Sequence, residues 1–326
     1  MKSKLIIIGK ISVSFILIAF LLTRIDLIQV WQQLKNLSWQ FIVLIMLYYT
    51  ALQLISCWRW QIVLKSTGHL VAIKTLFSSY FAGMFLNLFL PGSFGGDVYR
   101  VYRIAQKTKD TEAALVSVFL ERFTGLTALS MLAFCALPFA FVVVERWDII
   151  IIFFITIGVL VGGVLLIVSP KLLIFSERWL QKLRLSYLVA RIAKMQVLLI
   201  KFTHHRQALF YSISLSFILM LGIVYYHYLI AQQLRISVSY SQLLVFIPII
   251  TVITLLPISL GGMGVKEGLW VYLFGRIGLT AEQALLISLT MTILCWLLSL
   301  PGGLVLLFDA SGLAQVKQKF TLPFEG

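Results

Sequence analysis

The chain has 326 residues, of which 60% are hydrophobic and only 12% charged, and its mean hydropathy is +1.00. This composition excludes an ordinary soluble protein, and the short polar intervals leave no room for a soluble catalytic domain of roughly 100 residues. The net charge of +15 lies mainly in a few loops between apolar runs. That pattern is typical of membrane orientation and attraction to anionic lipid rather than of nucleic-acid binding. The sequence therefore predicts an all-α, polytopic helix bundle in which residues 1–326 form one transmembrane domain.

Six apolar runs are long enough to cross about 30 Å of hydrocarbon, which requires roughly 20 helical residues. In chain order, these predicted spans are residues 5–22, 39–57, 113–143, 149–168, 208–231 and 281–308. Lys10 interrupts the first run and no A-x-A-like cleavage site follows it, so we interpret this run as a retained span. The triplet Trp58-Arg59-Trp60 after the second run predicts an interfacial exit, with Arg59 reaching water.

Two further apolar segments, residues 75–90 and 241–257, end in backbone breaks that read "LPGSFGGD" and "LPISLGG". The breaks match at Leu, Pro, Ser and both final glycines. Proline and glycine interrupt helices, so each apolar segment is expected to stop at its break. Short helices are predicted to follow, over residues 97–109 and 264–277.

Basic loops orient these elements, because positively charged loops stay on the cytoplasmic side. Residues 170–207 contain eight Lys or Arg against one acidic residue, and their basic and apolar positions alternate at helical spacing. They are predicted to form an amphipathic cytoplasmic connector on the inner leaflet. Residues 58–74, residues 100–112 and the C-terminal tail are also basic, whereas the turn at 145–148 is net negative. The expected protein is a multi-pass protein of the cell (inner) membrane with both termini in the cytoplasm.

Counting membrane crossings predicts two re-entrant hairpins. Residues 75–109 lie between two cytoplasmic loops and must enter and leave from the cytoplasm, whereas residues 241–277 must enter and leave from outside. The hairpins therefore point in opposite directions, as in an inverted repeat that places a site between its copies near the bilayer midplane. The first repeat is predicted over residues 75–143 and the second over 241–308. The alternative is that Pro and Gly only kink two ordinary spans.

Polar residues at and after the breaks are candidates for binding an anionic headgroup. A helix that begins at a glycine-rich turn directs free N–H groups and its positive dipole end toward the turn, where serine can cap the helix or contact the anion. A charged side chain at the centre of a membrane helix costs about 2.5–3.5 kcal/mol, so such residues are expected to line an enclosed site. The candidates are Ser93, Gly95, Gly96, Asp97, Arg100, Arg103, Glu121, Arg122, Ser259, Gly261, Gly262, Lys266 and Glu267.

Structural roles stay open for these charges. They form ion pairs that lock the hairpins in the alternative interpretation, and capping its own helix is the simplest role for Asp97. Glu121 and Arg122 are adjacent, so they project in different directions and need not pair with each other. His227 is predicted to be a buried, hydrogen-bonded histidine, with a proton relay as the alternative. No metal or cofactor is predicted, because no cysteine has a partner at ligand spacing.

The two break regions resemble motifs in the transmembrane, flippase-like region of lysylphosphatidylglycerol synthases (multiple peptide resistance factors). The first family motif, P-G-x-x-G-G-D followed by a basic residue and a membrane Glu-Arg, matches at Pro91, Gly92, Gly95, Gly96, Asp97, Arg100, Glu121 and Arg122. The second, P-x-x-x-G-G-x-G-x-x-E, matches at Pro257, Gly261, Gly262, Gly264 and Glu267. Leu260 stands where the family often has another proline.

This resemblance implies translocation of an anionic phospholipid or lipid-linked headgroup between leaflets, with the hairpins forming the cavity. The family's synthase activity lies in a separate cytoplasmic domain, and we expect the stand-alone form without it, so aminoacyl transfer is not predicted. The expected partners are the lipid substrate and the membrane, and no motif of a nucleotide-binding or hydrolytic enzyme is present. Two alternatives stay open: a transferase acting on a polyprenyl- or phospholipid-linked donor, with Asp97, Glu121 and Glu267 as catalytic carboxylates, and a non-transporting partner of a lipid-modifying enzyme. A homo-oligomer also stays open.

Overall fold

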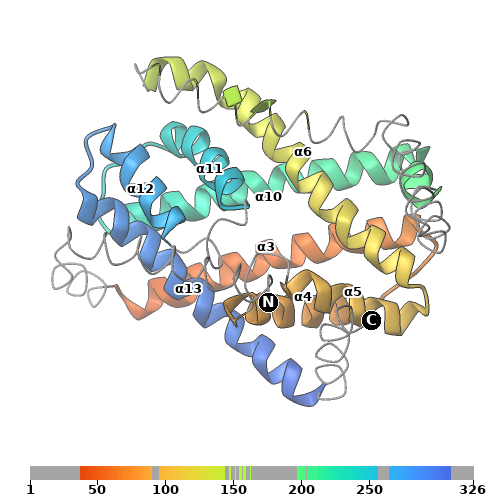
Figure 1. Cartoon of the computed structure of the whole chain (residues 1–326). Helices are drawn as coiled ribbons and strands as arrows, with labels where there is room; N and C mark the ends of the chain where they lie inside the picture. The colour runs from red at the N-terminus through yellow and green to blue at the C-terminus, as the bar shows by residue number, and fades with distance from the viewer. Residues whose placement is uncertain are drawn as a thin grey trace, which may run out of the picture.

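The computed structural model describes residues 37–89, 95–143, 197–202, 204–255 and 264–309, with isolated positions between 147 and 162. All regular structure in these residues is helical, which confirms the all-α prediction for this part of the chain (Figure 1). The helices that position the candidate residues are α3 (Trp39–Ser66), α4 (Ile73–Phe89), α5 (Gly95–Thr108), α6 (Thr111–Val143), α10 (Arg206–Gln233), α11 (Tyr240–Leu255), α12 (Val265–Gly275) and α13 (Ala281–Phe308).

Four helices in the described residues are long and apolar enough to cross a membrane. They are α3, α10, α13 and the Thr111–Ala136 part of α6. These helices cover the predicted spans 39–57, 113–143, 208–231 and 281–308. The predicted span 5–22, nearly all of 149–168 and most of the 170–207 connector lie outside the described residues. The total number of spans therefore stays a prediction.

The predicted interfacial exit after the second span is wrong for Arg59 and Trp60. Helix α3 continues through the triplet to Ser66, and both side chains are buried, with Arg59 only 3% exposed. Trp58, by contrast, is half exposed. The helix continues through the residues that follow the triplet. Arg59 therefore lies well inside it and needs a partner within the protein.

Local hydrogen bonds set the starts of several helices. The Ser38 hydroxyl accepts a hydrogen bond from the Phe41 backbone N–H at 3.3 Å and caps α3. Thr280 and Gln283 bond each other's backbone N–H at the start of α13, which is a capping box. Gly264, before α12, has a φ of 83°, a conformation that favours glycine. These caps fix where the polar side chains of the following turns point.

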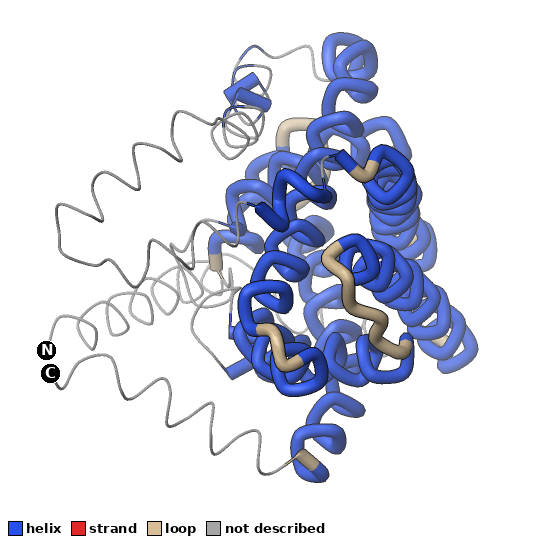
Figure 2. Tube along the Cα trace, turned by 90° about the vertical axis from the view of Figure 1, so that its right-hand side faces the viewer, coloured by secondary structure: helices blue, strands red, loops and turns tan. Residues whose placement is uncertain are grey.

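The short helices pack in pairs. Helix α4 contacts α5, and α11 contacts α12. The long helices α3 and α10 lie side by side and run in opposite directions (Figure 1). Contacts also cross between the two parts of the chain, since α13 packs on α4 and α6 packs on α11. The connections that the structure describes, which follow α3, α5, α10 and α12, are short loops (Figure 2). This packing brings α3, α5, α6 and α10 around one polar cluster.

Close helix contacts depend on glycine at two positions. A Cβ atom on Gly302 of α13 would overlap the backbone carbonyl oxygen of Phe81 in α4. A Cβ atom on Gly96 of α5 would overlap the carbonyl oxygen of Gly83, also in α4. Small residues allow such close backbone approach between membrane helices. Helix α4 is therefore held between α5 and α13 by backbone contacts that leave no room for a side chain.

We expect Gly302→Ala to lower the free energy of unfolding by about 1–3 kcal/mol, because the added methyl group must push α13 away from α4. The matched control is Gly268→Ala in α12, where a Cβ atom would meet nothing within 4 Å. Thermal unfolding of both variants in detergent measures the difference. Equal unfolding temperatures for the two variants would contradict the close contact.

Candidate functional site

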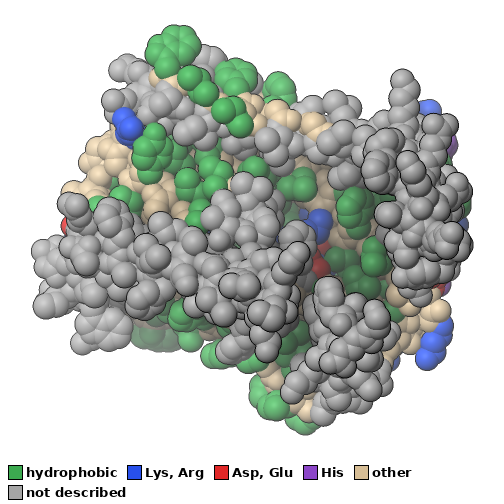
Figure 3. All heavy atoms as spheres, viewed as in Figure 1, with side chains coloured by type: hydrophobic (Ala, Val, Ile, Leu, Met, Phe, Trp, Pro, Cys, Tyr) green, Lys and Arg blue, Asp and Glu red, His purple; other side chains and the backbone are tan. Residues whose placement is uncertain are grey.

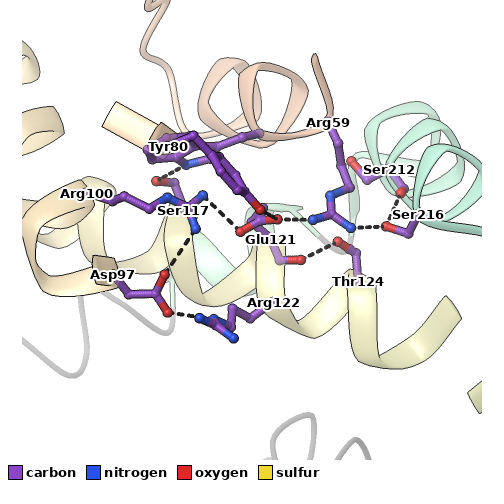
Figure 4. A network of polar contacts seen from close by, with 11 residues as sticks. Arg59, Tyr80, Asp97, Arg100, Ser117, Glu121, Arg122, Thr124, Ser212 and Ser216 are labelled. Carbon is purple, nitrogen blue, oxygen red and sulfur yellow. Dashed lines mark hydrogen bonds and ion pairs between the residues drawn. The ribbon is translucent and has the colours of Figure 1, made fainter. Parts of the chain in front are cut away.

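Glu121 of α6 is the centre of a buried charged cluster (Figure 4). Its residue is 2% exposed, and its two carboxylate oxygens have different arginine partners. Oε1 accepts a hydrogen bond from Nη2 of Arg59 on α3, and Oε2 accepts one from Nη2 of Arg100 on α5 at 2.9 Å. One carboxylate thus bridges an arginine of α3 and an arginine of α5 inside the bundle.

Arg100 is held by both charge and aromatic stacking. Its Nη1 donates to Oδ1 of Asp97 at 3.1 Å. The guanidinium carbon lies 4.1 Å from the ring centroid of Trp60 and 4.2 Å from that of Tyr80. A flat guanidinium group suits this arrangement, since it can stack on rings and bond carboxylates in its own plane. The side chain is 5% exposed, so these contacts enclose it.

Neutral side chains complete the buried part of the cluster. Trp60 Nε1 donates to Oγ of Ser117 at 3.1 Å, which fixes the ring that covers Arg100. Arg59 Nη1 donates to Oγ of Ser216 on α10 at 2.8 Å, and Ser216 in turn donates to the carbonyl oxygen of Ser212. Helix α10 is thereby bonded to the same cluster as α3, α5 and α6.

The cluster ends at a partly exposed ion pair between Asp97 and Arg122. Arg122 Nε donates to Oδ2 of Asp97 at 2.6 Å. The Arg122 side chain is 32% exposed and that of Asp97 12%, in contrast to the enclosed Arg59, Arg100 and Glu121. Figure 3 shows basic and acidic side chains together in a hollow bordered by hydrophobic side chains. We call the five charged residues Arg59, Asp97, Arg100, Glu121 and Arg122 the arginine–carboxylate cluster.

A smaller polar cluster lies at α12 and α13. Lys266 Nζ donates to Oγ1 of Thr292 and lies 3.4 Å from Oε1 of Glu267. Glu267 Oε2 accepts from the backbone N–H of Gly264 at 2.7 Å, and Ser288 Oγ lies 3.5 Å from its Oε1. The Lys266 side chain is 30% exposed, whereas that of Glu267 is 8% exposed. We call Lys266, Glu267, Ser288 and Thr292 the lysine cluster.

Arg103 belongs to neither cluster. It donates to the Tyr99 hydroxyl at 2.9 Å and pairs with Asp309, at the end of α13, at 3.7 Å. Tyr99 also donates to Oδ2 of Asp309, at 2.8 Å. These contacts join α5 to the end of α13, and they favour a structural role for Arg103 over the predicted headgroup contact.

The remaining predictions divide between described and undescribed residues. The structure brings Asp97, Arg100, Glu121 and Arg122 into one cluster, and Lys266 with Glu267 into another. The prediction that Glu121 and Arg122 need not pair with each other agrees with their separate partners. Gly95 and Gly96 begin α5, and the Gly96 N–H donates to Asn87 Oδ1 at 2.7 Å. The predicted site residues outside the described part of the chain are Ser93, Ser259, Gly261 and Gly262.

Two further single-residue predictions can be compared with contacts in the structure. The Asp97 carboxylate bonds Arg100 and Arg122, so its described contacts are ion pairs rather than a cap of its own helix. His227 is partly buried, its Nδ1 lies 2.6 Å from the carbonyl oxygen of Ile223, and its ring stacks on Trp270 with centroids 5.8 Å apart. This agrees with the hydrogen-bonded histidine. In the described residues, no three His, Cys, Asp or Glu side chains gather closely enough to hold a metal ion.

Sequence reasoning missed Arg59. The signal that could have identified it is the apolar continuation "QIVL" after the triplet, which keeps Arg59 within a helix instead of at its end. A buried arginine needs an acidic partner. Glu121, the acidic residue in the next long apolar run, supplies it.

Residues 7–302 match the family model described as the lysylphosphatidylglycerol synthase transmembrane region. Both clusters lie within the matched residues. Comparison with curated proteins and with solved structures finds no match. Together with the four apolar helices, the family match indicates a multi-pass membrane protein.

Proposed function

We propose that this chain, which belongs to the lysylphosphatidylglycerol synthase transmembrane-region family, translocates an anionic phospholipid or lipid-linked headgroup between the two leaflets of a membrane. The observation that carries the proposal is the arginine–carboxylate cluster, which lies between apolar helices and ends at the partly exposed Asp97–Arg122 pair. Charges at such depth are costly and mark functional pathways in membrane proteins.

The lengths of the short helices support their proposed place as re-entrant hairpins. Helices α4 and α11 have 17 and 16 residues, so at 1.5 Å per residue each is about 25 Å long, less than the roughly 30 Å hydrocarbon core. Their partners α5 and α12 are shorter still, with 14 and 11 residues. We propose that α4–α5 enters from the cytoplasm and α11–α12 from outside, and that both chain termini are cytoplasmic in the cell membrane.

Exchange of ion-pair partners is the proposed mechanism. Before a headgroup arrives, the Asp97 carboxylate pairs with Arg122, which offsets part of the cost of holding a charge between apolar helices. A phosphate oxygen of the headgroup then replaces the Asp97 carboxylate at Arg122, and Asp97 keeps its second partner, Arg100. When Asp97 returns to Arg122, the headgroup is released. The acyl tails stay in the lipid throughout, and no covalent bond needs to change.

We expect Arg122→Gln to slow headgroup movement about tenfold, because a charge-assisted hydrogen bond contributes about 1.5 kcal/mol. The measurement is the accessibility of fluorescent phosphatidylglycerol to an added quencher in vesicles that contain the purified protein. The control is Lys107→Gln, which removes an exposed positive charge from the end of α5 and is expected to leave the rate unchanged.

The same vesicles test the whole proposal. If the wild-type protein moves the lipid no faster than protein-free vesicles do, the transport function is wrong. Mass spectrometry of the recovered lipid distinguishes the transferase alternative, since a transferase leaves a covalently altered lipid and a translocator does not.

A further inference from the structure

The two parts of the chain repeat one order of helices. Helices α3 to α6 have 28, 17, 14 and 33 residues, and helices α10 to α13 have 28, 16, 11 and 28. Each part is therefore long, short, short, long. The contacts between the two parts also correspond. In each part the last long helix packs on the first short helix of the other part, because α13 packs on α4 and α6 packs on α11. Side chains at matching positions thus have similar neighbouring helices.

Two sequence matches align the charged side chains of these parts. Counting forward from the glycine pair of each break aligns Arg100 of α5 with Lys266 of α12. The stretches "AALVS" and "ALLIS", near the starts of α6 and α13, align Glu121 with Thr292, each four residues after the serine. In both parts, the aligned positions are thus a basic residue on a short helix and a polar residue on the long helix that follows it.

Both aligned pairs are in direct contact. Arg100 Nη2 donates to Glu121 Oε2 at 2.9 Å, and Lys266 Nζ donates to Thr292 Oγ1. The contact is thus the same in position but different in chemistry. In the first part the acceptor is a carboxylate, and in the second it is an uncharged hydroxyl.

Lys266 is also less enclosed than Arg100. The Arg100 side chain is 5% exposed and stacked between two rings, whereas that of Lys266 is 30% exposed. A lysine ammonium has three N–H donors, and the described residues contact it at two atoms, Thr292 Oγ1 and Glu267 Oε1. The exposed side of this ammonium therefore suits one more acceptor oxygen.

Glu267 does not take the place of Glu121. Its Oε2 bonds the Gly264 N–H at 2.7 Å, at the beginning of α12, and its Oε1 lies 3.5 Å from Ser288 Oγ. These bonds hold the carboxylate on its own helix, whereas Glu121 reaches Arg100 from the long helix that follows. Glu267 thus pairs with Lys266 from α12 itself, whereas the described part of α13 offers a hydroxyl, that of Thr292, where α6 offers the Glu121 carboxylate.

We propose that Lys266, beside the Thr292 hydroxyl, binds an anionic oxygen of a lipid phosphodiester at the position that the Glu121 carboxylate takes beside Arg100. In the first part of the chain the protein supplies this anion itself, so the Arg100 site is closed. In the second part the ligand supplies it. The assignment rests on the proposed translocation, because it names the headgroup group and the side chains that hold it.

Thr292→Glu tests this assignment by giving Lys266 a second carboxylate, from α13, in addition to that of Glu267. We expect native mass spectrometry to show at least tenfold less phosphatidylglycerol retained by this variant than by the wild-type protein. The matched control is Thr292→Gln, because glutamine has the size of glutamate without its charge. This variant is expected to retain an amount of phosphatidylglycerol within threefold of wild type. Lys266→Gln removes the cation without adding bulk and is also expected to lose at least tenfold. Thermal unfolding checks that each variant is folded.

Each outcome decides a separate point. If folded Thr292→Glu and Lys266→Gln both retain the lipid as Thr292→Gln does, the assignment is wrong, even where vesicle assays show that the wild-type protein moves lipid. If retention depends on Lys266 but vesicle assays show no movement, the site stands and the proposed function is wrong. Free inorganic phosphate is the other source of such an anionic oxygen, and calorimetric titration tests whether the protein binds it. Binding of phosphate that is lost in Thr292→Glu, with no lipid retained by the wild-type protein, would overturn the lipid headgroup as the ligand.

Discussion

Glu121→Gln is expected to lower the free energy of unfolding by about 3–5 kcal/mol, the usual cost of leaving a buried charge without its partner. The five residues of the cluster are three arginines and two carboxylates, so among them the positive charges exceed the negative charges by one. Removing the Glu121 charge leaves Arg59 without its described acidic partner and Arg100 with Asp97 alone. The measurement is thermal and denaturant unfolding in detergent, with the folded fraction followed by size-exclusion chromatography.

Arg100→Met is the control for this effect, because it breaks the same contact from the other side. It leaves one arginine for each carboxylate, Arg59 for Glu121 and Arg122 for Asp97. Methionine also keeps an apolar side chain between Trp60 and Tyr80. We therefore expect a smaller loss of stability than in Glu121→Gln. An equal or larger loss in Arg100→Met would show that stacking or packing, rather than charge balance, dominates this cluster.

Much of the described helical layout could be predicted from the sequence. The predicted span 281–308 has the bounds of α13, and the predicted segment 241–257 differs from α11 by one or two residues at each end. These bounds are predictable because they depend on local causes. Capping boxes, Ser239 with Gln242 and Thr280 with Gln283, mark the starts of α11 and α13, and Pro257 follows the end of α11 by two residues.

The partners of the charged residues could not be predicted in the same way. Arg59 and Glu121 are 62 positions apart, and their contact depends on how α3 packs against α6. The sequence interpretation placed Arg59 at the membrane surface because tryptophan is frequent there. In the structure the Trp60 ring covers a guanidinium group instead, which is a tertiary contact without a local signal.

The sequence is similarly compatible with two roles for each charge. It predicts a headgroup contact for Arg100, with structural ion pairs as the alternative. Its enclosure by Asp97, Glu121 and two aromatic rings favours the structural role. Arg122 and Lys266 keep partly exposed side chains, so the proposed contacts with the headgroup fall to them. Burial, which the sequence could not give, separates these residues.

Asp97→Asn provides the sharpest test of the proposed partner exchange. Asparagine keeps the size of the side chain but removes the charge that neutralises Arg122. Without lipid, we expect the free energy of unfolding to fall by about 2–3 kcal/mol, because two charge-assisted hydrogen bonds, to Arg100 and Arg122, are weakened. The headgroup, however, no longer competes with the Asp97 carboxylate at Arg122. We therefore expect the variant to retain several-fold more phosphatidylglycerol and to move it about tenfold more slowly, since Asp97 no longer displaces the headgroup.

Asp309→Asn is the matched control, because Asp309 also pairs with an arginine of α5 but lies outside the arginine–carboxylate cluster. It should lower stability less and leave lipid retention unchanged. Tighter retention combined with slower movement is a signature that simple destabilisation does not produce, because a loosened bundle would lose lipid as well as activity. If Asp97→Asn lowers retention and movement together, Asp97 acts only through the stability of the fold, and the exchange mechanism at Arg122 is wrong.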